Sequence, residues 1–256
     1  MAASRDPFSS PKQRLARANE HIARLHKRIE TFFKKAPYRN VVELDDDGVT
    51  QLHKLKFTKR LPDSCVHAAT EALEALGSTL DQTGYAAAIA SGKIAPKRTQ
   101  FPIGDSPAGL ENLIKKKVAA DLPDEILALF LSFKPYKGGN DLVWALNKLR
   151  NATHATLISV SVVSDGMLSV GVGYLSNNAS IPGNLALDAE KNEIIFARVG
   201  PGGTFKYDLR FSFLVALGEL DILARHQAVA VLREMSAEVR RIFTATREKC
   251  HEMGFL

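Results

Sequence analysis

Apolar residues recur along the first forty positions with the spacing of a packed helix. They lie three and four residues apart, which places them on one face of a helix: Leu15, Ala18, Ile22, Leu25, Ile29 and Phe32. Ser10 and Pro11 supply a start signal, and Pro37 supplies a stop signal. The pattern predicts a long helix over about residues 11–36. Its apolar seam is expected to pack on the C-terminal helix or on a second copy of the chain.

A short hairpin is predicted after this helix. Residues 40–44 and 49–57 have the character of strands, and the acidic turn 45–48 joins them. Three aspartates in the turn raise the alternative of a calcium site. The alternating oxygen ligands and the distal glutamate of such a loop are absent, so the turn is interpreted as a hairpin connection.

Helical signals return over the central part of the chain. Pro62 and Asp63 open a helix that ends near Gly92. Shorter helices are predicted to start near residues 106 and 123. A further helix, capped by Asn140, is predicted to run through residue 154.

From residue 155 the spacing of apolar residues changes from the helical period to strict alternation, a period of two residues. Apolar positions alternate over 158–162 and 168–174, with a turn signal at Asp165 and Gly166 between them. Two further strands are predicted over 194–199 and 205–213. Together they indicate an antiparallel sheet with one buried face. The tail from about residue 225 has an amphipathic helical pattern, which can cover the sheet or pack on the N-terminal seam.

These elements predict an α+β fold: a helical bundle combined with an antiparallel sheet and a C-terminal helix. Because the linkers are short, one domain is expected over residues 1–256, helix-rich over 1–154 and carrying the sheet and last helix over 155–256. No apolar run is long enough to cross a membrane, and the N-terminus lacks the apolar core of a signal peptide. With two widely separated cysteines, Cys65 and Cys250, the chain is expected to be cytoplasmic.

The positive charge is concentrated at the start of the chain. Residues 1–60 hold 14 basic and 7 acidic side chains, whereas the remaining residues hold 20 and 21. A local basic surface of this kind indicates a polyanion such as RNA as a partner. The alternative is a solvated helix face without a ligand. The candidate nucleic-acid-binding residues on the long helix are Arg14, Arg17, Arg24, Lys27, Arg28, Lys34 and Lys35.

The strongest chemical candidate is the pair Arg150 and His154. On one helix these positions lie on the same face, so a fixed cation and a titratable imidazole would project together. Asp81 is a candidate orienting partner, since a carboxylate among small and apolar neighbours needs a counter-charge if it is buried. The alternative interpretation is structural: Arg150 and His154 bond to Asp81 or to backbone. No metal-ligand spacing and no cofactor motif is present in the sequence, so neither a metal nor a cofactor is expected.

Several short motifs resemble those of a widespread group of uncharacterised bacterial proteins. The matching residues are Leu80-Asp81-Gln82, 100–103 (Gln-Phe-Pro-Ile), Pro135-Tyr136 and 151–154 (Asn-Ala-Thr-His). Gln82 stands where that group has a histidine, and the last motif is one residue short. The resemblance implies no activity, because the group has none established.

A more distant resemblance is to the HEPN superfamily of helical proteins. Arg150, Asn151 and His154 are similar to its Arg-Asn-x-x-x-His motif shortened by one residue. This resemblance implies metal-independent RNA cleavage by a dimer, with His154 as acid or base and Arg150 stabilising the phosphorane charge. Two hypotheses follow: a binding module that self-associates through helical seams and holds a polyanion, or a HEPN-like ribonuclease of toxin or phage-defence type.

Overall fold

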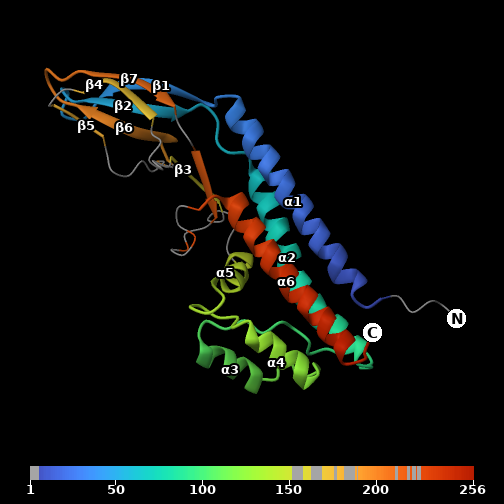
Figure 1. Ribbon diagram of the computed structural model, residues 1–256. Helices are drawn as coiled ribbons and strands as arrows, with labels where there is room; N and C mark the ends of the chain where they lie inside the picture. Colours follow the sequence, from blue (N-terminus) through green and yellow to red (C-terminus); the bar gives the residue numbers. More distant parts are fainter. Residues whose placement is uncertain are drawn as a thin grey trace.

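The computed structural model describes residues 6–151, 158–162, 169–175, 178–181, 188, 190–210, 213–217, 220, 223 and 226–256. It has the α+β architecture that the sequence predicts: a bundle of long helices, a group of shorter helices beside it, and antiparallel strands at one end (Figure 1). His154 lies outside the described residues.

Three long helices form the bundle. They are α1 (Ser9–Lys34), α2 (Asp63–Ala90) and α6 (Ala228–Glu252), and they run side by side in Figure 1. The predicted seam of α1 is buried, with Ile29 at its margin. It packs mainly on α2 and less extensively on α6. The seam is therefore covered within one chain, by α2 and by the C-terminal helix α6, which is one of the two partners that the sequence allowed. The other expectation, that the seam packs on a second copy of the chain, stays a prediction.

The three short helices start where the sequence places them. Ser106 accepts a hydrogen bond from the Gly109 amide before α3 (Pro107–Lys115), and α4 spans Asp124–Ser132. Asn140 accepts from the Val143 amide at the start of α5 (Asp141–Arg150). However, α5 ends at Arg150 with Asn151 as its C-cap, short of the predicted end at residue 154, and the predicted place of His154 on this helix lies outside the described residues.

The predicted hairpin is confirmed and becomes part of a larger sheet. Strands β1 (Tyr38–Leu44) and β2 (Gln51–Phe57) pair antiparallel, and β2 then pairs with β6 (Glu193–Val199), which pairs with β5 (Ala179–Ser180). The second strand starts two residues later than predicted. Asp47 Oδ1 accepts from the amides of Val49 and Thr50, which keeps both in the turn.

The turn signal at Asp165 and Gly166 favoured pairing between the strands on either side of it, but each of these strands pairs with a later strand. Strand β3 (Ile158–Val162) pairs with β8 (Phe213–Leu217), and β4 (Ser169–Leu175) pairs with β7 (Phe205–Arg210). The single strand predicted over 205–213 is thus two strands with different partners. The Asp165–Gly166 turn lies outside the described residues.

Apolar side chains form two clusters. The larger lies among the helices and includes Val215 and Leu217 of β8. The smaller lies in the sheet and consists of Leu55, Ile194, Phe196, Ala197, Val199 and Phe205. Charged side chains of β1, β2 and β6 form a network of ion pairs. Lys54 Nζ lies 2.8 Å from Glu193 Oε1 and 3.0 Å from Glu43 Oε2, and Lys56 also pairs with Glu43.

Candidate functional site

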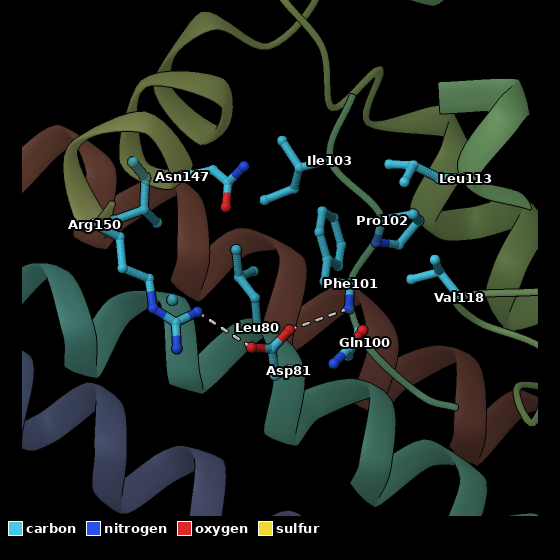
Figure 2. Close-up of a pocket in the computed structure, with 12 residues that line it drawn as sticks. Leu80, Asp81, Gln100, Phe101, Pro102, Ile103, Leu113, Val118, Asn147 and Arg150 are labelled. Atoms are coloured by element: carbon cyan, nitrogen blue, oxygen red, sulfur yellow. Dashed lines mark hydrogen bonds and ion pairs between the residues drawn. The ribbon is translucent and has the colours of Figure 1, made fainter. Parts of the chain in front are cut away.

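A pocket of about 290 Å³ brings together Asp81, the 100–103 link and Arg150, three of the features that the sequence singled out (Figure 2). It lies between α2, the 100–103 link, α3 and α5. Its polar groups come from Asp81, Gln100, Asn147 and Arg150, and apolar side chains complete the lining: Leu80, Phe101, Pro102, Ile103, Leu113, Val118 and Leu146. Segments twenty to seventy residues apart in sequence thus meet at one point.

Asp81 joins the segments around this pocket. Its Oδ1 accepts a hydrogen bond from the Phe101 amide at 3.3 Å, and its Oδ2 lies 3.3 Å from Arg150 Nη1 (Figure 2). One carboxylate on α2 therefore fixes both the extended link and the last residue of α5. The structural interpretation of Arg150 as a partner of Asp81 agrees with this geometry.

Arg150 is held by a second carboxylate that the sequence analysis missed. Arg150 Nε lies 3.0 Å from Glu74 Oε2 on α2. Burial alone would lower the pKa of Arg150, but the hydrogen bonds to Glu74 and Asp81 raise it above its usual value. The signal for Glu74 was its position seven residues before Asp81, two helical turns away on the same face. With two carboxylates and one guanidinium, the group carries a net charge of −1.

Two glycines of α2 make room for this arrangement. A Cβ at Gly77 would lie 2.8 Å from Arg150 Nη1, and a Cβ at Gly84 would lie 2.1 Å from the carbonyl oxygen of Thr99. Gly77, Asp81 and Gly84 follow one face of the helix at i, i+4 and i+7. This face of α2 is therefore shaped to receive Arg150 and the extended link.

Asn151 has a different environment from Arg150. Its side-chain amide donates to the carbonyl oxygen of Asn147 at 2.8 Å, it is exposed, and it does not line the pocket. Of the four candidate catalytic residues, the described structure brings together Arg150 and Asp81. The relation of His154 to them is not part of the described structure.

The second candidate site is the basic surface of α1. Arg28 donates to the carbonyl oxygen of Ser64, and Arg24 Nη1 lies 3.7 Å from Glu71 Oε2, so α2 engages both. The other five predicted residues are exposed, and none has a side-chain hydrogen bond or ion pair to another described residue. They are Arg14, Arg17, Lys27, Lys34 and Lys35.

This surface continues onto the junction with the sheet. The Thr58 amide donates to the Pro37 carbonyl oxygen at 2.8 Å, which holds the end of α1 beside the segment before α2. Exposed cations from both segments gather there, and we call them the basic neck: Lys34, Lys35, Arg39, Lys59 and Arg60. The last three were not among the predicted residues, although they contribute to the excess charge of residues 1–60.

The described residues show neither a cluster suited to a metal nor a helix suited to a membrane. No group of three or more His, Cys, Asp or Glu side chains among them could hold a metal ion. No described helix is both long and apolar enough to span a bilayer. Comparison of the chain with protein-family models, curated proteins and solved structures finds no match.

Proposed function

We propose that this protein is a nucleic-acid-binding module whose contact surface is the outer face of α1 with the basic neck. The observation that carries the proposal is the set of exposed α1 cations that no described acidic group neutralises. A cation already paired within the protein gains little from a phosphate, whereas an unpaired one releases counterions from the nucleic acid on binding.

The length of this surface suits a polyanion. Arg17 and Lys35 are eighteen residues apart on one side of α1, a span of about 27 Å at the rise of an α-helix. Along one strand of a duplex this distance covers roughly eight phosphates. The exposed face of α1 has no aromatic side chains among its cations, so base stacking is absent there. Binding is therefore expected through the backbone, with little sequence preference.

The proposal is tested with a fluorescently labelled single-stranded RNA and the full chain. In the double variant Lys27→Glu, Lys34→Glu, two exposed cations of α1 become acidic, and we expect affinity at low salt to fall roughly tenfold or more. The matched control is Lys115→Glu, Lys116→Glu, which makes the same charge change at the end of α3. Affinity is measured by fluorescence anisotropy. Equal losses in the two variants, or no loss in the first, would contradict the proposal.

The HEPN-like ribonuclease remains the alternative hypothesis. In its favour, Arg150 and Asp81 share a pocket. Against it, Glu74 and Asp81 already engage the guanidinium, so a phosphate would have to displace a carboxylate from a group of net negative charge. The same binding samples, kept in EDTA and analysed for RNA length, separate the hypotheses. Cleavage that is lost in both Arg150→Ala and His154→Ala would favour the enzyme.

A cytoplasmic location and a homodimer belong to the same proposal. Cys65 and Cys250 are free and buried, which suits a reducing compartment. Because the α1 seam is covered within the chain, a second copy needs another surface.

A further inference from the structure

The outer edge of β1 has no partner strand among the described residues. In the four-stranded sheet β1 is the terminal strand, seven residues long. Its sequence contains neither lysine nor proline, which commonly protect such edges from pairing, and its charged residues are Arg39 and Glu43. Val42 and Leu44 are 50% and 61% exposed. This edge is therefore open to a further strand.

The hydrogen-bond pattern shows which backbone groups of β1 point outward. Asp45 N donates to Thr50 O at 2.7 Å, and Thr58 N donates to Pro37 O at 2.8 Å. Positions 37 and 45 therefore face β2, and the register between them has no shift, so positions 39, 41 and 43 face it too. By alternation, the N–H and C=O groups of residues 38, 40, 42 and 44 point away from β2.

We infer that a second copy of this chain binds this edge, β1 against β1 in antiparallel orientation, with Val41 facing the partner's Val41. Two requirements select this register. An antiparallel ladder needs outward-pointing residues opposite one another, so the positions of each facing pair must add to an even number. Among such registers, centring on Val41 pairs all seven residues, from Tyr38 opposite the partner's Leu44 to Leu44 opposite the partner's Tyr38.

The charges of β1 are complementary in the same register. Arg39 is exposed, has no side-chain ion pair among the described residues, and stands opposite the partner's Glu43. Because the dimer has two-fold symmetry, this contact occurs twice in the interface. Within each chain Glu43 also pairs with Lys54 and Lys56, so Arg39 adds a further cation to an existing ion-pair group. Positions 39 and 43 form non-hydrogen-bonded pairs, in which the side chains of an antiparallel ladder lie closest. A shift by two residues would place Glu43 opposite the partner's Val41 and shorten the ladder.

Pairing also gives the apolar face of β1 apolar neighbours from the second copy. Val42 and Leu44 project from the same face as Leu55, a member of the sheet cluster that lies opposite Asn40 in the neighbouring strand. Pairing continues this face into the second copy, where the partner's Tyr38 comes beside Leu44. The interface is small, at the lower end of the size range for specific complexes, so a reversible dimer is expected.

Disulfide trapping tests the register directly. In Val41→Cys, the two introduced thiols face each other across the axis at a Cα separation of about 4.5 Å, within the range for a disulfide. The control Val42→Cys places its thiol opposite the partner's Asn40. Cys65 and Cys250 are buried, so the background is low. Under mild oxidation we expect covalent dimer from Val41→Cys at least tenfold faster than from Val42→Cys. Equal rates would overturn the register.

Sedimentation of the reduced proteins tests the dimer itself. The wild-type chain of 28.0 kDa is expected to shift towards twice that mass as its concentration rises. Arg39→Glu places an acidic group opposite the partner's Glu43 and should hold the protein monomeric. Arg60→Glu makes the same charge change outside β1 and should still dimerise. A wild-type protein that stays monomeric throughout, or equal behaviour of the two variants, would overturn the inference.

Discussion

His53 is a buried histidine whose environment favours its neutral form. It is 6% exposed, and its ring contacts Phe205 and Phe196 at centroid distances of 5.3 and 6.1 Å. Burial lowers the pKa of His53. Between the folded value and the unfolded value of about 6.5, the unfolded chain therefore binds more protons.

This shift predicts a loss of stability in mild acid. The contribution of His53 is fully present above pH of about 6.5 and is lost as the pH falls towards its folded pKa. Urea unfolding at pH 7.5 and pH 5.0 measures the effect. In His53→Leu the fall in unfolding free energy between the two values should be smaller than in the wild type. An unchanged difference would show that His53 is not the group responsible.

Some residue-level chemistry could be predicted from the sequence and some could not. Asp81 was a candidate partner of Arg150 because a carboxylate among small residues needs a counter-charge. Glu74, the other partner, is also flanked by small and apolar residues, but it is exposed on α2, where a glutamate needs no counter-charge. Arg28 was grouped with the unpaired cations, because its acceptor is a backbone oxygen of Ser64, which no side-chain pattern reveals.

At the scale of elements, the contact between α2 and the extended link depends on Gly84. Alanine there would bring its Cβ to 2.1 Å from a backbone oxygen that cannot move without the link. We expect Gly84→Ala to destabilise the protein by about 2 kcal/mol, because the overpacking outweighs the gain of roughly 1 kcal/mol in helix propensity.

Gly77→Ala is the matched substitution on the same helix. Its new Cβ meets the Arg150 side chain, which can swing aside, so the change in unfolding free energy should stay within about 1 kcal/mol of zero. Urea midpoints of the two variants measure the difference. Equal destabilisation would show that the close approach at Thr99 is not what requires glycine at position 84.

The helices and the first hairpin were predicted well because their signals are local. Ser106, Asn140 and Pro62 mark helix starts, and the 45–48 turn marks a hairpin. The pairing of β3 with β8 and of β4 with β7 joins residues at least thirty positions apart, and alternation along a strand does not identify its neighbouring strand. The end of α5 at Arg150 was missed because no glycine or proline follows it.

On the scale of the whole molecule, the excess positive charge forms one surface to which two segments of the chain contribute. The sequence placed it on α1, and the fold adds Arg39, Lys59 and Arg60 through the hydrogen bond between Thr58 and Pro37. A β1 dimer would carry two such surfaces, one on each side of the two-fold axis. The guanidinium of Arg150 at the pocket, by contrast, is already paired with Glu74 and Asp81 within the chain.

The salt dependence of RNA binding tests the central claim most directly. Five cations of α1 have no ion-pair partner among the described residues. If each of them contacts a phosphate, a plot of the logarithm of the association constant against the logarithm of salt concentration should have a slope of roughly −3.5. In Lys27→Glu, Lys34→Glu the slope should become shallower by about 1.4, the share of two contacts. A wild-type slope near zero, or the same slope in the variant, would contradict binding through the basic surface of α1.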